Sequence, residues 1–175
     1  MPERPMVFTK NPACAIPGGE AIVIPKICQD QEQVDFEGEL AIVIGSVAKD
    51  VAKEDVGRVI LGYAAANDVS ARWWQKQGSG GQFCRGKSFD TFCPLGEVRA
   101  AAEVKSPNAL RLTTKLNGQV MQDETTGDMI FDVATLVSEL SRGTTLLPGT
   151  VILTGTPSGV GTARKPPVYL KDGDV

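Results

Sequence analysis

The sequence predicts an α+β domain that is rich in β-strands. Short apolar runs with many β-branched residues recur along the chain, bounded by glycine, proline and other turn residues, as in sheets whose strands are joined by turns. Only a few segments place apolar residues at helical spacing. The 175 residues suffice for a sizeable core and contain no repeat or linker, so we expect a single domain over residues 1–175.

Charge and hydropathy exclude several classes of protein. The net charge is −3 and lysine and arginine are not clustered, so the chain lacks the basic patch that binds nucleic acid. No apolar run approaches the roughly 20 residues that cross a bilayer, and we expect no contact with a membrane. The polar start, Met1–Pro5, has no apolar segment of a signal peptide behind it. We therefore expect an intracellular protein, either cytoplasmic or mitochondrial.

The sequence contains no histidine, which limits the chemistry that it can perform. No histidine general base and no Ser-His-Asp triad can come from this chain. Its four cysteines are not in CxxC spacing, which argues against a zinc site and favours free, buried thiols. Any bound metal must be held by oxygen, as Mg²⁺, Mn²⁺ and Ca²⁺ are.

The first part of the chain is expected to form strands. Val7–Lys10 is a short candidate, and Ala21–Pro25 is a second that its proline ends. Val34–Gly45 is the strongest candidate, because β-branched residues crowd its second half and a glycine ends it.

Two acidic residues lie near the start of this strongest strand. Side chains alternate between the faces of a strand, so Glu37 and Glu39 point the same way. Like charges this close repel, and burying them unpaired is costly. A bound divalent cation would remove both problems. A solvated strand end with both carboxylates in water explains this stretch equally well.

The middle of the chain mixes short elements. We expect a short helix over Lys53–Leu61 and a strand or tight buried segment over Gly62–Asn67. Asp68–Gln75 has helical composition and runs into a glycine-rich loop, whereas Ser88–Leu95 is rich in aromatic residues and threonine and is expected to be extended.

The expected helix after residue 67 carries three polar side chains. Asp68, Arg72 and Gln75 would share one face at positions i, i+4 and i+7. A carboxylate, a guanidinium and an amide together suit a metal and an anionic substrate. The spacing alone favours a simpler interpretation, in which Asp68 caps the helix and Arg72 is its ion-pair partner.

The segment Gly81–Ser88 matches the phosphate-binding pattern G-x-x-x-x-G-K-[ST]. That loop requires a buried strand before it and a helix after it. Here a polar, glycine-rich stretch precedes the motif and poor helix formers follow it, so we interpret the match as chance. Lys87 remains a lone cation among aromatic residues, although a surface lysine that extends its ammonium into water would give the same pattern.

The last part of the chain contains clearer signals. Asn117-Gly118 between Leu110–Lys115 and Gln119–Gln122 predicts a β-hairpin. Asp132 is expected to cap an amphipathic helix that ends near Gly143.

A strand is expected over Val151–Thr154, followed by a Gly/Thr/Ser loop to Gly161. In such a loop, backbone amides and the Thr156 hydroxyl can approach a ligand closely, although an ordinary tight turn has the same composition. Lys171–Val175 reads as a turn that leads into a new strand, and the chain also begins abruptly. We therefore expect a chain that is shortened at both ends.

Four of these segments, taken in order, resemble the fumarylacetoacetate hydrolase family. The resemblance covers Phe8 to Val175. Within the family, the chain most resembles the subgroup of fumarylacetoacetate hydrolase domain-containing protein 2, and Arg164–Leu170 supports that assignment. The four motifs are the stretch DFEGELAIVIG, then NDVSAR, then GKSFDTFCPLG, and finally TGTPSGVG.

The resemblance implies a β-roll or mixed β-sandwich, usually in a homodimer, with one divalent ion, Mg²⁺, Mn²⁺ or Ca²⁺. The family's metal ligands match Glu37, Glu39 and Asp68. The family positions that contact substrate match Arg72, Gln75, Lys87 and Thr156.

The resemblance also implies an enzyme that acts on a small 2-oxo or 2,4-dioxo acid through a metal-stabilised enolate. Lys87 would be the catalytic cation beside the enolate, and Thr156 would donate a hydrogen bond to it. The outcome would be C–C bond hydrolysis, decarboxylation or oxaloacetate tautomerisation. A truncated, inactive homologue that binds a metal and a ligand or partner is the alternative.

Three departures from the family pattern bear on that choice. The histidine-bearing lid of the family's hydrolases has no counterpart here, Trp73 stands where aspartate is usual, and Glu97 stands where proline is common. Tautomerisation tolerates the missing histidine best, because it needs only a metal, enolate stabilisation and a proton relay.

Overall fold

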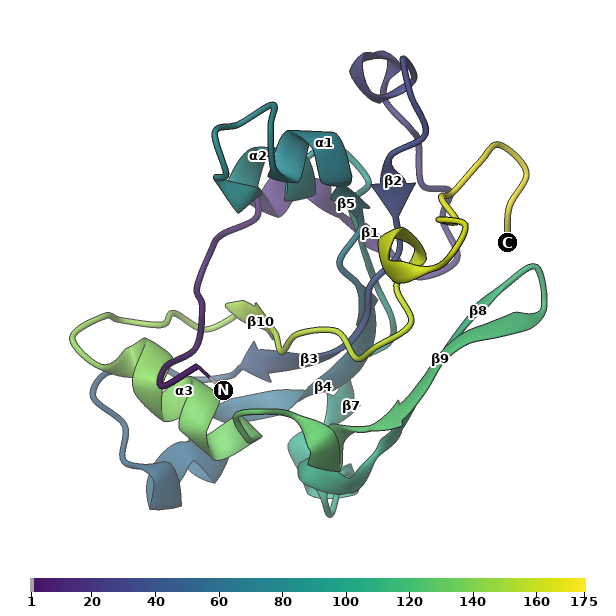
Figure 1. The fold of residues 1–175 in the computed structure, drawn as a ribbon. Helices are drawn as coiled ribbons and strands as arrows, with labels where there is room; N and C mark the ends of the chain where they lie inside the picture. Colours follow the sequence, from purple (N-terminus) through teal and green to yellow (C-terminus); the bar gives the residue numbers. More distant parts are fainter. Residues whose placement is uncertain (1) are drawn as a thin grey trace.

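A mixed β-sheet lies at the centre of the computed structural model, which describes residues 2–175 (Figure 1). Its strand order is β1-β6-β4-β3-β10, and β7 pairs with β4 as well. The first two strands run parallel and the other pairs antiparallel, which confirms the predicted β-rich α+β fold. The strands of this sheet are β1 (Ala15–Pro17), β3 (Gly38–Ile44), β4 (Ile60–Asn67), β6 (Cys93–Leu95), β7 (Arg99–Ala100) and β10 (Val151–Leu153).

Shorter elements surround the sheet. Two small antiparallel pairs are formed by β2 (Val34–Asp35) with β5 (Ser70–Ala71), and by β8 (Arg111–Leu116) with β9 (Gln119–Thr125). The α-helices are α1 (Arg72–Gln75), α2 (Phe83–Lys87) and α3 (Val133–Ser141). Short segments of 3-10 helix are η1 (Pro12–Cys14), η2 (Lys26–Cys28), η3 (Lys53–Arg58), η4 (Ala101–Glu103), η5 (Pro107–Ala109), η6 (Thr126–Asp128) and η7 (Gly161–Ala163).

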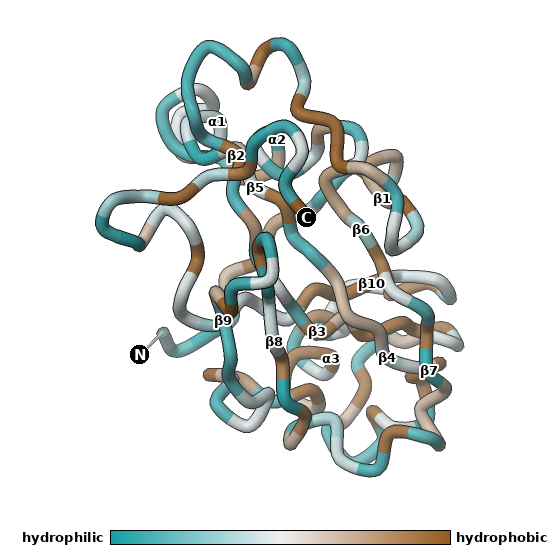
Figure 2. Tube along the Cα trace, turned by 90° about the vertical axis from the view of Figure 1, so that its right-hand side faces the viewer, coloured by the Kyte–Doolittle hydropathy of each residue, from teal (hydrophilic) through white to brown (hydrophobic). Residues whose placement is uncertain are grey.

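Strand β3 is the central element, and all seven of its residues are buried. Leu40, Ile42 and Ile44 share one face and pack with Val133 and Val137 of α3. On the opposite face, Ala41 packs with Ala64 and Ala66 of β4. Figure 2 shows the same distribution, with apolar segments gathered where β3, β4 and α3 meet. Burial on both faces explains why this strand reads as a continuous apolar run.

The predicted hairpin is confirmed. Asn117 and Gly118 join β8 to β9 and have φ angles of 52° and 80°, the left-handed region in which Asn and Gly are tolerated. The hairpin packs directly on the start of β3, because a Cβ on Gly38 would lie 2.1 Å from Thr114 Oγ1. A glycine at this position therefore allows the hairpin to approach β3.

The predicted helix after Asp132 is also confirmed as α3. The Asp132 carboxylate accepts a hydrogen bond from the backbone N–H of Thr135 at 2.7 Å, and Gly143 follows the helix with a φ of 68°. In the described residues α3 is the longest helix, with nine residues, and none is long and apolar enough to cross a membrane.

Asp132→Ala is expected to lower the free energy of unfolding by about 1 kcal/mol, because it leaves N–H groups of the first turn of α3 without a partner. Urea unfolding followed by circular dichroism measures this change. Asp132→Ser, which keeps a capping oxygen, is the control and should retain most of the stability. An equal loss in both variants would contradict a capping role.

Two predicted strands are wrong. Residues 7–10 and 21–25 belong to no strand. The backbone N–H of Val23 donates to the Thr91 hydroxyl at 2.8 Å instead of to a neighbouring strand, and Pro25 has no N–H to donate. Strand β1 lies between the two segments.

Other elements are shorter than the sequence predicts. The expected helix at 53–61 is the 3-10 segment η3, and β4 already begins at Ile60. The expected helix at 68–75 is reduced to α1, because Ser70 and Ala71 pair with β2. Within 88–95 only β6 is a strand, and a turn precedes it.

The expectation of free, buried thiols holds for most of the cysteines. All four are free; Cys14, Cys28 and Cys93 are buried, whereas Cys84 is exposed.

Candidate active site

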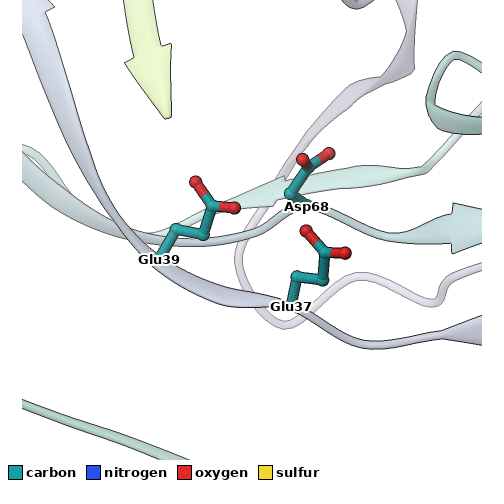
Figure 3. A group of neighbouring side chains, drawn as sticks. All are labelled: Glu37, Glu39 and Asp68. Carbon is teal, nitrogen blue, oxygen red and sulfur yellow. The ribbon is translucent and has the colours of Figure 1, made fainter. Parts of the chain in front are cut away.

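Three buried carboxylates converge beside the central strand (Figure 3). One oxygen from each of Glu37, Glu39 and Asp68 lies within 4.8 Å of the others. Glu39 lies on β3, Glu37 immediately precedes that strand, and Asp68 immediately follows β4. The antiparallel pairing of β3 with β4 brings the three together although Asp68 is far away in sequence.

Burial and mutual repulsion characterise this cluster. The exposed fractions of Glu37, Glu39 and Asp68 are 7%, 2% and 1%, so the interpretation of Glu37 and Glu39 as a solvated strand end is wrong. Burial, with the charges of Asp68 and Glu37, raises the pKa of Glu39 from its ordinary value of 4.5 to about 8. Three hard oxygen donors that repel one another fit an ion such as Mg²⁺, Mn²⁺ or Ca²⁺.

Lys87 is enclosed by this cluster. Its side chain is 2% exposed, and its ammonium lies 2.8 Å from Glu37 Oε2 and also pairs with Asp68. The alternative of a surface lysine in water is therefore wrong. A Cβ on Gly86 would lie 2.5 Å from the backbone nitrogen of Gln75, so this glycine lets α2 pack closely on α1.

The context of Lys87 agrees with a chance match to the phosphate-binding motif. No described strand leads into Gly81, the helix α2 lies inside the motif, and turns follow it. The ammonium that would contact a phosphate is paired with two carboxylates.

Arg72 contacts a different set of partners from those that helical spacing suggests. Its Nε donates to Asp35 Oδ2 at 2.8 Å, and its Nη1 donates to Glu37 and to Gln75 Oε1, the latter at 3.0 Å. Asp68 neither caps α1, whose N-cap is Ala71, nor pairs with Arg72. The simple capping interpretation is wrong because Ser70 and Ala71 are in a strand.

The loop after β10 lies along β3 and forms a further wall of the site. The backbone N–H of Gly155 donates to Glu39 Oε2 at 2.7 Å. The Thr156 hydroxyl donates to the carbonyl of Gly38 at 3.0 Å and accepts a hydrogen bond from Gln122 Nε2 at 2.8 Å. These contacts leave the second oxygen of Glu39 free of this loop.

A cavity of about 1500 Å³ opens onto the cluster. Glu39, Asp68 and Thr156 line it, together with Lys10. The other predicted site residues do not line the cavity and lie in a buried layer, in which Lys87 pairs with Asp68 and Arg72 pairs with Glu37; they are Glu37, Arg72, Gln75 and Lys87.

Three residues at the site are absent from the sequence-based prediction. Lys10 Nζ lies 2.7 Å from Asp68 Oδ1, and the Gln122 amide joins Thr156 to the N–H of Gly38. No local pattern marks either residue. The third, Asp35, shares the alternating face of Glu37 and Glu39 at position i−2, so the same spacing rule could have found it.

The charges of the site leave one carboxylate in excess. Four acidic side chains, namely those of Asp35, Glu37, Glu39 and Asp68, face three cations, namely Lys10, Arg72 and Lys87. A divalent ion would reverse this balance and leave a site that attracts an anion.

Comparison with known proteins identifies similar chains. The sequence model described as "Fumarylacetoacetate (FAA) hydrolase C-terminal" matches residues 1–175. Among curated proteins, "Oxaloacetate tautomerase fahd2, mitochondrial" of Xenopus laevis is 43% identical over 100% of this chain and 54% of its own length. "Oxaloacetate tautomerase FAHD2A, mitochondrial" of Homo sapiens is 43% identical over 99% of this chain and 55% of its own length. The chain thus spans about half the length of these relatives.

Solved structures share the fold. A fumarylacetoacetate hydrolase from Exiguobacterium antarcticum aligns with a TM-score of 0.86 and 42% identity over 96% of this chain and 59% of its own. A 5-carboxymethyl-2-hydroxymuconate delta-isomerase from Mycobacterium smegmatis aligns with a TM-score of 0.87 and 43% identity, covering 99% of this chain and 63% of its own.

Proposed function

The chain belongs to the fumarylacetoacetate hydrolase family, and from this premise we propose that it is a divalent-metal-dependent enzyme that interconverts the keto and enol forms of oxaloacetate. The observation that carries the proposal is the buried cluster of Glu37, Glu39 and Asp68, with ligand oxygens within 4.8 Å of one another. The relatives named oxaloacetate tautomerase support the choice of substrate.

The three carboxylates would hold the ion, for which Mg²⁺, Mn²⁺ and Ca²⁺ are the candidates. When bound, such an ion polarises the 2-oxo group of a chelated acid and stabilises negative charge on its oxygen. The excess positive charge of the loaded site suits a dicarboxylic acid.

The side chains around the ion would stabilise the enolate and bind the substrate. Lys87, held between Glu37 and Asp68, supplies a buried positive charge that favours an enolate. Thr156 offers a hydroxyl at the cavity wall. Arg72 and Gln75, which the family pattern implies for substrate binding, would act from the buried layer through Glu37. Lys10 lines the cavity as well, and can meet a substrate carboxylate there.

Tautomerisation suits a chain without histidine. The reaction moves one proton between carbon and oxygen and breaks no C–C bond, so no water has to be activated for attack. Hydrolysis of acylpyruvates and decarboxylation of oxaloacetate use the same enolate but make further demands on water or on product protonation.

The decay of enol-oxaloacetate, followed by its ultraviolet absorbance, tests the proposal. With Mg²⁺ or Mn²⁺ the protein should accelerate the decay at least about tenfold over metal alone, and EDTA should abolish the acceleration. Glu37→Gln is the matched inactive control. Metal-dependent cleavage of acylpyruvates without tautomerisation would assign a hydrolase instead, and metal binding without turnover of either substrate would overturn the enzymatic proposal.

We also propose a homodimer located in mitochondria. The family resemblance supports the dimer, and the names of the mitochondrial relatives support the compartment. Light scattering after size exclusion measures the first, and fractionation of cells that express the complete protein measures the second.

A further inference from the structure

Asp35 is a fully buried carboxylate that lies outside the proposed metal ligands. It is 0% exposed and lies on β2, two residues before Glu37. Its Oδ1 accepts hydrogen bonds from the backbone N–H groups of Gly161, at 2.7 Å, and Phe36, at 2.9 Å. Its Oδ2 accepts from the N–H of Thr162 at 2.9 Å.

The same Oδ2 also binds a guanidinium. Arg72 Nε donates to it at 2.8 Å, and Arg72 Nη2 lies 2.7 Å from it. Both oxygens of Asp35 are therefore surrounded by donors, and no described contact joins Asp35 to the cavity. Asp35 alternates with Glu37 and Glu39 in sequence but lies on β2, outside the sheet that carries Glu39, and it is not part of the cluster of three carboxylates.

The contacts of Asp35 continue to a proposed metal ligand. Arg72 donates through Nε to Asp35 and through Nη1 to Glu37, so one planar guanidinium bridges the two carboxylates. Because guanidinium geometry is rigid, the position of Asp35 fixes the direction from which Arg72 approaches Glu37. Gln75 accepts from the same Nη1 and restrains it further.

Asp35 also anchors the far end of the loop that walls the site. This loop is held at one end by Glu39, through the N–H of Gly155, and at the other by Asp35, through Gly161 and Thr162. A Cβ on Gly161 would lie 2.6 Å from Asp35 Oδ1, so the close approach requires glycine.

From these contacts we propose that Asp35 is a positioning residue for the metal site: through Arg72 it orients Glu37, and through the Gly161–Thr162 turn it holds the Thr156 loop against β3. The inference rests on the metal site proposed above. It assigns to Asp35 an effect on metal affinity that a purely structural carboxylate would lack.

Calorimetric titration of the metal-free protein with Mn²⁺ tests the proposal. Asp35→Asn keeps the size of the side chain but removes its charge and turns an N–H₂ group toward Arg72 or the loop amides. We expect the Mn²⁺ dissociation constant to rise about 10–100-fold, as it does when outer partners of metal ligands are changed. Asp132→Asn is the matched control, because Asp132 also accepts a backbone N–H but does so at α3; its Mn²⁺ affinity should stay within about twofold.

The outcomes separate the two proposals. If the unaltered protein binds no Mn²⁺, the metal site itself is wrong. If it binds Mn²⁺ and folded Asp35→Asn binds equally well, the metal site stands and the role of Asp35 is overturned. Should Asp35→Asn not fold, Arg72→Lys tests the same link, because lysine keeps the charge but cannot bridge Asp35 and Glu37 as a fork; unchanged affinity in folded Arg72→Lys would then overturn the proposal.

Discussion

Lys87→Met is expected to destabilise the metal-free protein by about 3–5 kcal/mol, because it removes one partner from a buried ion-pair network. The variant leaves Glu37 and Asp68 without the ammonium that lies between them. Lys10 would then be the remaining cation on Asp68. Urea unfolding in EDTA measures the loss.

The same variant should respond strongly to metal. A divalent ion bound by the three carboxylates would replace part of the lost positive charge, so Mn²⁺ should raise the unfolding midpoint of Lys87→Met more than that of the unaltered protein. Turnover should nevertheless fall about 10²–10³-fold, since the charge that favours the enolate is absent. With metal present, Lys87→Met should therefore regain stability without regaining turnover.

Lys53→Met is the matched control for this substitution. Lys53 is exposed, and its ammonium donates to the Thr135 hydroxyl of α3 and pairs with no member of the acidic cluster. It should change neither the metal response nor turnover. A Lys87→Met protein that is as stable in EDTA as the unaltered chain would contradict the buried pairing.

Local sequence rules predicted the elements whose causes are local. The hairpin follows from Asn117-Gly118 and α3 from its cap at Asp132, and both are observed where expected. Strand β3 was predicted because an uninterrupted apolar run suits a strand buried on both faces. The alternation rule placed Glu37 beside Glu39, although the predicted strand Val34–Gly45 is divided into β2 and β3 and Glu37 lies between them.

The sequence did not predict ion pairs between residues that are far apart along the chain. Helical spacing suggests Asp68 for Arg72, but the guanidinium instead pairs with Asp35 and Glu37, more than thirty residues earlier. The i, i+4 spacing does not apply because Ser70 and Ala71 form strand β5 and the helix begins only at Arg72, and the buried Asp35 and Glu37 would be costly to leave unpaired. Lys10 likewise pairs with Asp68, 58 residues later in the sequence.

The family resemblance, rather than local pattern, proposed Asp68 as a companion of the two glutamates. The structure brings the three carboxylates together through the β3–β4 pairing, which no spacing rule reveals. The direct contact of Gln122 with Gly38 and Thr156 is a further consequence of tertiary packing, since it depends on the hairpin crossing β3.

Glu39→Gln is expected to have opposite effects on stability and on metal binding. Glu39 is the member of the cluster that no described cation pairs with directly, and it accepts one N–H, from Gly155. A glutamine can accept the same hydrogen bond without the cost of a buried charge. It cannot supply an anionic oxygen, so Mn²⁺ affinity should fall about a hundredfold or more.

The effect on stability should depend on pH in a defined direction. In the folded metal-free protein the pKa of Glu39 is raised to about 8, above its ordinary value of 4.5. The folded state therefore holds a proton that the unfolded chain releases, and the stability of the unaltered protein should fall as the pH rises from about 4.5 to about 8. Glutamine does not titrate, so this contribution should vanish in Glu39→Gln.

Unfolding in EDTA at pH 5 and at pH 9 measures the difference. At pH 9 Glu39→Gln should be more stable than the unaltered protein by roughly 1–4 kcal/mol, and at pH 5 the two should be nearly equal. Glu103→Gln, an exposed glutamate-to-glutamine change, should show no such divergence. If Glu39→Gln instead lost stability at pH 9, Glu39 would be a well-compensated anion in the metal-free protein, and mutual repulsion within the cluster could not be what favours a divalent ion.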